Sequence, residues 1–153
     1  MKKLLALDLG TTTGWATNAS GVVTSGLWKF TPSRYEGGGM RFLRFRCQLG
    51  QIVALLGRID AVYYEEVRHH IGTDAAHIYG GLLAVLTAWC EEQGIPYQGI
   101  PVGTIKKHAT GKGNAKKAMM ISAARERGWN PQDDNEADAL WILDCALTMN
   151  AAL

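Results

Sequence analysis

Carboxylate side chains stand at three separate places in the sequence where metal chemistry is conceivable. Asp8 lies within the aliphatic run LLALDL, Glu65 and Glu66 follow the run AVYY, and the acidic stretch DDNEAD occupies positions 133–138. Metal-assisted phosphoryl chemistry needs several carboxylates that converge from separate elements, because Mg²⁺ prefers hard oxygen ligands. The three places together therefore suit a metal site.

The two adjacent glutamates cannot both face the same site. Successive side chains of a strand point to opposite faces of its sheet, so Glu65 shares one face with Tyr63 and Glu66 shares the other with Tyr64. Only one of the two glutamates can therefore join Asp8, and the alternation by itself leaves the choice open.

Helical spacing selects the residues of the acidic stretch that can lie on one side. Asp134 and Asp138 are four residues apart, and Asn135 and Asp138 are three apart. Negative charge at a helix start also complements the helix dipole and caps free N–H groups, which suits Asp133 or Asp134. It does not suit Asp138, which lies a full turn further among alanine and leucine. A carboxylate in such surroundings, like Asp8, is costly unless it is paired or bound to metal.

The turn that follows Asp8 admits a second chemistry. The stretch DLGTTTG at 8–14 resembles the first phosphate loop of the actin, sugar kinase and chaperone ATPase superfamily. Those proteins close two such domains around the nucleotide, whereas this chain has the length of one and lacks a second Asp-x-Gly loop. The basic loop at 110–113 is not a Walker loop, because Lys106 stands where a glycine is required. We therefore favour a metal-binding Asp8 and expect no nucleotide cofactor.

Charged residues are unevenly distributed, although the formal net charge is only +2. Residues 106–127 hold seven basic side chains against one acid, and a second basic set lies at 34–46. Separate basic and acidic zones are typical of a surface that binds a polyanion around a metal centre, although a solvated charged face is the simpler alternative.

The remaining composition excludes several classes of protein. The three cysteines are widely separated and form no CxxC pair, so neither a zinc site nor a disulfide framework is indicated. No stretch reaches the roughly 20 apolar residues of a membrane span. We therefore expect one cytoplasmic domain that covers residues 1–153, with no membrane partner.

The elements that must position the carboxylates alternate after an initial meander of strands. Apolar periodicity and turn residues predict strands at 3–9, 14–18, 21–30, 60–67 and 95–102, and helices at 40–58, 74–94, 114–128 and 134–149. This order predicts an α/β fold with a mixed five-stranded sheet, in which three antiparallel strands precede parallel strands and helices cover both faces.

Taken in order, these motifs resemble those of the RuvC-type Holliday junction resolvases, a branch of the RNase H-like nucleases. LALDLGTTTGWA matches the family's first strand with its catalytic aspartate at Asp8, and YYEEV resembles the strand that carries the catalytic glutamate, at Glu65. VGTIKKHATGKGNAKKAMM is similar to the family's basic segment, where Lys106 and Lys117 fit the DNA-contacting positions. NPQDDNEADALWI resembles the end of the pattern, with the final aspartate at Asp138. The match is collinear over nearly the whole chain, and the short length and the DDNEADALW ending look like phage or prophage members.

The resemblance implies an RNase H-like fold and a nuclease site. Its catalytic and metal-binding residues would be Asp8, Glu65, Asp134 and Asp138, holding two Mg²⁺ ions for which Mn²⁺ can substitute. The family's other C-terminal ligand falls at Asn135 here, so we expect Asp134, one residue earlier, to replace it and keep Asn135 as the alternative. DNA contacts are expected from Lys106, Lys112, Lys116, Lys117, Arg41 and Arg44.

The implied activity is the resolution of four-way junctions by two symmetric nicks, which requires a homodimer. The apolar helix at 75–90 is the candidate interface, although core packing explains its apolar face equally well. Many relatives carry a wedging aromatic residue after the glutamate motif, whereas Arg68, His69 and His70 follow here. A branched-DNA-binding protein that does not cut remains the alternative, because Asn135 departs from the family pattern. An ATPase is the least favoured function.

Overall fold

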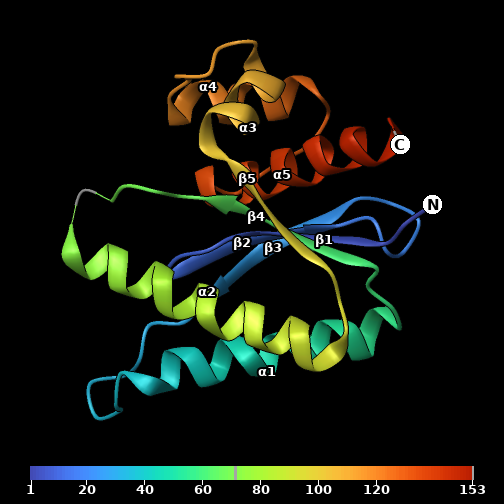
Figure 1. Cartoon of the computed structure of the whole chain (residues 1–153). Helices are drawn as coiled ribbons and strands as arrows, with labels where there is room; N and C mark the ends of the chain where they lie inside the picture. Colours follow the sequence, from blue (N-terminus) through green and yellow to red (C-terminus); the bar gives the residue numbers. More distant parts are fainter. Residues whose placement is uncertain (71, 153) are drawn as a thin grey trace.

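A five-stranded mixed sheet forms the centre of the computed structural model, which describes residues 1–70 and 72–152 (Figure 1). The strands are β1 (Leu4–Asp8), β2 (Thr12–Thr17), β3 (Thr24–Lys29), β4 (Ala61–Glu66) and β5 (Tyr97–Pro101), in the order β3-β2-β1-β4-β5. β1 pairs antiparallel with β2 and β2 with β3, whereas β4 runs parallel to both β1 and β5. The predicted α/β fold with a mixed sheet is confirmed.

Helices cover both faces of the sheet (Figure 1). They are α1 (Gly39–Leu56), α2 (Thr73–Gln93), α3 (Val102–Thr110), α4 (Lys117–Glu126) and α5 (Asp134–Ala151). α1 and α2 pack on one face, and α5 lies on the other with α3 and α4 stacked against it. Among the described helices, none combines the length and apolar character that crossing a bilayer requires.

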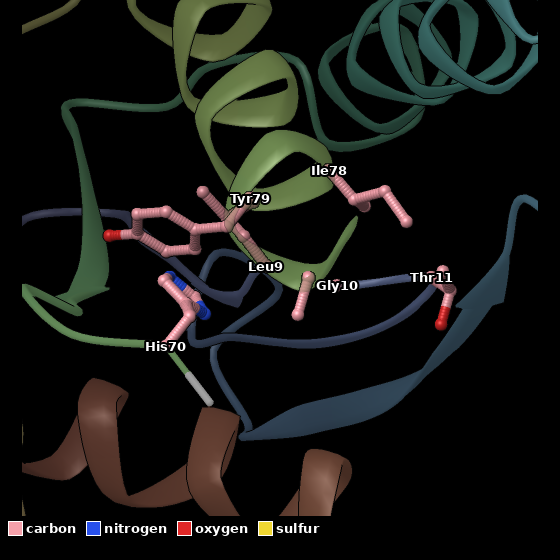
Figure 2. Close-up of a pocket in the computed structure, with 7 residues that line it drawn as sticks. Leu9, Gly10, Thr11, His70, Ile78 and Tyr79 are labelled. Atoms are coloured by element: carbon pink, nitrogen blue, oxygen red, sulfur yellow. The ribbon is translucent and has the colours of Figure 1, made fainter. Parts of the chain in front are cut away.

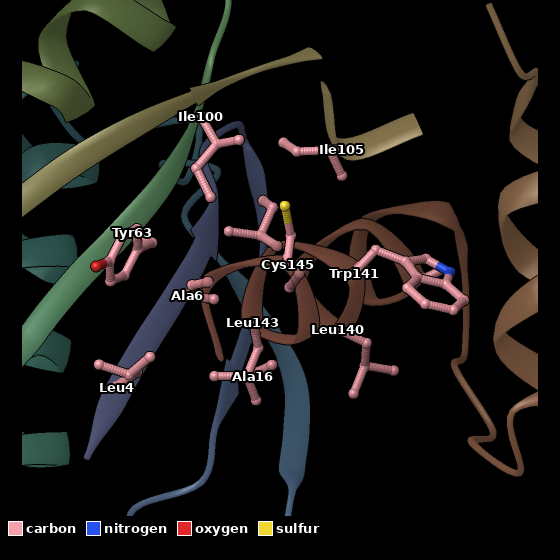
Figure 3. Close-up of a cluster of buried hydrophobic side chains, with 14 of the residues drawn as sticks. Leu4, Ala6, Ala16, Tyr63, Ile100, Ile105, Leu140, Trp141, Leu143 and Cys145 are labelled. Carbon is pink, nitrogen blue, oxygen red and sulfur yellow. The ribbon is translucent and has the colours of Figure 1, made fainter. Parts of the chain in front are cut away.

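The alternation of β1 decides which face carries its carboxylate. Leu5 and Leu7 are buried among α1 and α2, while Leu4 and Ala6 are buried under α5, as Figure 3 shows. Asp8 continues the even-numbered series and therefore lies on the α5 side. Small residues on this face, Ala6 and Ala16, let α5 lie close to the strands.

The connection between β5 and α4 differs from the sequence prediction. Residues 102–110 form α3, where no helix was expected, and α4 begins at Lys117 and not near Asn114. α3 buries fully only Ile105, so the segment lacks the repeated apolar spacing that predicts a helix. Asn114 is exposed and does not cap α4: the N-cap residue is Lys116, which follows the buried Ala115.

A network around Asp144 joins α3 and the end of α4 to α5. His108 Nε2 lies 2.7 Å from one carboxylate oxygen of Asp144, and Arg127 donates to both oxygens at 2.8 and 3.1 Å. Burial by itself raises the pKa of Asp144, but the hydrogen bonds with Arg127 and His108 outweigh it, and the pKa lies below its ordinary value. The ionised carboxylate thus stabilises the packing of α3 and α4 against α5.

Replacing Asp144 with asparagine is expected to destabilise the protein by on the order of 1–3 kcal/mol at neutral pH, because Arg127 and His108 lose a charged partner. A lowered carboxyl pKa contributes stability above the unfolded pKa, and this stability is lost as pH falls through the folded pKa. Urea unfolding at neutral pH and down to about pH 3 should therefore show the gap between wild type and Asp144→Asn closing with acid. Asp74→Asn, at an exposed acid, serves as the control. A difference in unfolding free energy between wild type and Asp144→Asn that stays constant with pH would contradict the lowered pKa of Asp144.

Candidate metal centre

Three carboxylates from distant parts of the sequence meet at one edge of the sheet. Asp8 ends β1, Glu65 lies near the end of β4 and Asp138 lies in the second turn of α5. Their oxygens lie within 4.8 Å of one another. β1 and β4 are parallel neighbours, so their carboxyl ends reach the same edge, where α5 begins (Figure 1). Glu66 has no part in this group and pairs with Arg68 at 3.2 Å.

The electrostatics of this centre are unfavourable without a cation. Burial, followed by the charges of Glu65 and Asp138, raises the pKa of Asp8 well above its usual range. Burial also raises the pKa of Glu65, and burial together with the Glu65 and Asp134 charges raises the pKa of Asp138 to about 7. Oxygen ligands gathered this closely fit a hard divalent cation, whose charge would offset their repulsion.

Asp134 and Asn135 lie outside the group of three carboxylates. Asp134 is 3.5 Å from the ammonium group of Lys117, and its charge still raises the pKa of Asp138. The Asn135 amide donates to Asp133 at 3.1 Å. The assignment of either residue as a fourth ligand therefore stays a prediction.

The other two acids at the start of α5 hold the helix in place. The carboxylate of Asp133 accepts a hydrogen bond from the backbone N–H of Glu136 at 2.9 Å, which caps the helix. The buried Glu136 accepts from the Ser25 hydroxyl at 2.6 Å and from the Gln132 backbone at 2.8 Å. These bonds tie the first turn of α5 to β3 and so place Asp138.

A basic groove with a volume of about 560 Å³ opens beside the carboxylates. Glu65 and Asp138 line one part of it, and Lys106 from α3 and Lys116 and Lys117 from the start of α4 line another. Lys112 is exposed in the loop between α3 and α4. Ammonium groups facing carboxylates suit a phosphodiester backbone, whose charge the lysines would neutralise.

The two arginines predicted to contact DNA lie apart from this groove. Arg41 and Arg44 are on α1, on the sheet face opposite to α3 and α4 (Figure 1). Arg44 pairs with Glu36, and its hydrogen bond lowers the pKa of Glu36 to about 2. Arg41 Nε is shielded from solvent and has no hydrogen-bond partner within the described chain. A role of both arginines in DNA contact stays a prediction.

Sequence reasoning missed two residues that position the carboxylates. Tyr79 of α2 donates to the backbone oxygen of Glu65 at 2.7 Å and accepts from the Val67 N–H at 3.1 Å, which fixes the end of β4. In the sequence, Tyr79 is marked only as a polar hydroxyl within an otherwise apolar helix. Because a buried tyrosine hydroxyl needs a hydrogen-bond partner, this position could have been singled out. A Cβ atom on Gly14 of β2 would lie 2.0 Å from the Asn135 carbonyl oxygen, so glycine lets α5 rest on the strand.

The chain thus has an RNase H-like fold with acidic side chains gathered at the carboxyl ends of its central strands. Comparison with protein-family models and with curated protein sequences gives no match. Among solved structures, the RuvC Holliday junction resolvases share its fold. Thermus thermophilus RuvC in complex with a Holliday junction substrate has a TM-score of 0.78 and 21% identity, over 99% of this chain and 97% of that one.

Two further structures agree with this likeness. Thermus thermophilus RuvC has a TM-score of 0.74 and 22% identity, over 97% of this chain and 96% of that one. The yeast mitochondrial Holliday junction resolvase Ydc2 has a TM-score of 0.66 and 14% identity, over 98% of this chain and 79% of that one. The predicted resemblance to RuvC-type proteins is confirmed at the level of the fold.

Proposed function

We propose that this protein is a metal-dependent endonuclease that resolves four-way DNA junctions by paired symmetric nicks. The observation that carries the proposal is the convergence of Asp8, Glu65 and Asp138 beside a groove lined by lysines. The likeness in fold to a RuvC bound to a Holliday junction substrate supports the same substrate class here.

The proposed site would hold two Mg²⁺ ions, or Mn²⁺, on Asp8, Glu65, Asp138 and, as the fourth ligand, Asp134. When bound, these ions supply an activated water and stabilise the leaving 3′ oxygen of the phosphodiester. The chain's own residues set the geometry: Tyr79 restrains the backbone of Glu65, and the capped first turns of α5 hold Asp138. The lysines of the groove hold the phosphates on either side of the cut.

A second candidate is a protein of the same fold that binds branched DNA without cutting it. The ion pair between Asp134 and Lys117 favours this candidate, because it occupies the side chain that would supply the fourth ligand. Asn135 cannot replace Asp134 as a charged ligand, because its amide oxygen carries no formal charge and its NH2 group donates to Asp133.

Cleavage of a labelled four-way junction decides between the two candidates. With Mg²⁺, wild type should produce symmetric nicks, Asp8→Asn should bind without cutting, and Asp74→Asn, at an exposed acid at the start of α2, should cut like wild type. Junctions that stay intact with both Mg²⁺ and Mn²⁺ but are bound would support the non-cutting protein. Failure to bind would contradict both, and stabilisation by nucleotides would favour an ATPase.

The lysine groove predicts a measurable dependence of DNA binding on salt. Lys116→Ala should weaken junction binding and reduce the slope of log affinity against log salt by about 1, because one phosphate contact is lost. Binding by the Asp8→Asn protein at several salt concentrations measures this slope without cleavage. Lys2→Ala, at an exposed position before β1 and therefore at the opposite edge of the sheet, is the control and should leave the slope unchanged. Equal slopes for both variants would show that Lys116 does not contact a DNA phosphate.

Two symmetric nicks need two centres, and we propose that α2 forms the dimer interface. Its outer side carries the small residues Gly80, Ala84 and Ala88 at four-residue steps, all exposed, which permits close approach of a second helix. Ala84→Arg should convert a dimer into a monomer in light scattering and uncouple the two nicks. Ala54→Arg, at an exposed position of α1, should stay dimeric. A wild-type protein that is monomeric both free and on the junction would contradict the interface.

A further inference from the structure

A separate cavity lies beside the metal centre, on the α2 side of the sheet (Figure 2). Its volume is about 330 Å³, and its walls come from the turn Leu9–Thr11, from His70 and from the first turns of α2. The turn follows Asp8 directly, and the lining residue Tyr79 is hydrogen-bonded to the backbone of Glu65. The cavity therefore lies next to the backbone of Asp8 and Glu65. The lysine groove lies on the α3 and α4 side.

The walls of the cavity favour an uncharged ligand. Leu9, Ala75 and Ile78 supply apolar surface, the ring of Tyr79 supplies a flat wall, and no acidic or basic residue other than His70 lines the cavity among the described residues. A phosphate or carboxylate would meet no lysine or arginine among the described residues that line it. The volume lies at the lower end of the roughly 300–1,000 Å³ of small-molecule sites. A flat, uncharged ring with polar atoms at its edge fits these walls.

His70 gives the cavity one unused polar group. Its Nε2 is shielded from solvent and has no hydrogen-bond partner in the part of the chain that the structure describes. Its ring lies 5.0 Å from that of Tyr79, and Figure 2 shows the two rings side by side. The Tyr79 hydroxyl is already bonded to Glu65 and Val67. A buried ring nitrogen without a partner is unfavourable, and a ligand atom that pairs with it would remove this cost.

We propose that this cavity receives an unpaired nucleobase of the branched DNA, next to the scissile phosphate, and that His70 hydrogen-bonds to its edge. The proposal rests on the proposed function, since a phosphodiester held at Asp8 is what brings the neighbouring base to the cavity. A branch point unpairs and unstacks bases at low cost, and apolar or aromatic walls with one polar partner match the faces and the edge of a base. His70 would then determine base specificity and would not be a catalytic residue.

Binding in the Asp8→Asn background tests the proposal without cleavage. Four-way junctions carry an abasic residue at one nucleotide at a time on either side of the cut. When the abasic residue replaces the nucleotide whose base enters the cavity, the junction should bind on the order of tenfold more weakly than the intact junction. With His70→Ala added, the intact and abasic junctions should bind alike. Ala75→Phe, at an exposed position, should remove the difference by filling the cavity, without changing His70.

The control is His69→Ala, an exposed neighbour that does not line this cavity and should keep the tenfold difference. The cavity proposal is overturned if no abasic position matters in the Asp8→Asn protein, or if the difference survives both His70→Ala and Ala75→Phe. If the protein binds junctions but never cuts them, the nuclease proposal is wrong, and this binding test still decides whether the cavity receives a base. A protein that binds no branched DNA fails both.

Discussion

Asp138→Asn is expected to abolish metal-dependent cleavage and, in the same protein, to raise the thermal stability of the metal-free state at neutral pH. The loss of cleavage should be on the order of a thousandfold or more, because a metal ligand that contributes several kcal/mol disappears. The gain in stability follows from removing one of three half-buried carboxylates that lie within 4.8 Å of one another.

The pH dependence of that gain has a definite sign. Burial, together with the charges of Glu65 and Asp134, raises the pKa of Asp138 to about 7, so the folded state binds this proton more tightly than the unfolded state. The metal-free wild type therefore loses stability as pH rises from about 4 to about 7, by on the order of 4 kcal/mol from this group. Asp138→Asn lacks this loss, and its stability should exceed that of wild type most clearly above pH 7.

Thermal unfolding with chelator and with Mg²⁺, across this pH range, measures both effects. Wild type should gain stability from Mg²⁺ at neutral pH, whereas Asp138→Asn should gain little. Asp74→Asn, at an exposed acid, should behave like wild type in both conditions. If Asp138→Asn were less stable than wild type without metal, or were stabilised equally by Mg²⁺, the three carboxylates would not form a metal centre.

Gly14→Ala is expected to destabilise the fold by about 3 kcal/mol and to remove metal binding from the protein that remains folded. The added Cβ would lie 2.0 Å from the carbonyl oxygen of Asn135 and 2.5 Å from its carbonyl carbon. Both are backbone atoms of α5, so no side chain can rotate to relieve the clash. The start of α5 would have to move away from β2, and Asp138 would move with it.

Urea unfolding compares this variant with a glycine whose surroundings are open. Gly50 lies inside α1, and a Cβ built there meets no atom within 4 Å. Gly50→Ala should stabilise the protein by about 0.5–1 kcal/mol, because alanine loses less backbone entropy in a helix. The two substitutions therefore have opposite expected signs. An unfolding midpoint for Gly14→Ala equal to that of wild type would show that α5 does not rest on the β2 backbone.

Much of the fold could be predicted from the sequence, because its strands and long helices carry strong local patterns. β1 is continuously apolar up to Asp8, and in α1 the apolar residues Phe45, Leu49 and Ile52 are buried as their spacing predicts. α3 could not be predicted, because it buries fully one side chain, Ile105, and so has no periodicity to detect. Its position depends instead on contacts such as that of His108 with Asp144, 36 residues later.

Local pattern also determined which side chains of each element share a face. The alternation of β4 separates Glu65 from Glu66, and helical spacing separates Asp138 from the capping acid Asp133; both hold whatever the rest of the chain does. These are properties of single elements, set by the geometry of the backbone.

Only the tertiary structure decided which faces meet. The parallel pairing of β1 with β4 brings Glu65 beside Asp8, and the close packing of α5 against Gly14 brings Asp138 to the same edge. The bond from Tyr79 to Glu65 and the cavity at His70 depend in the same way on where α2 docks against the sheet. Such contacts join residues far apart in sequence through the shapes of packed surfaces, which no local pattern of residues records.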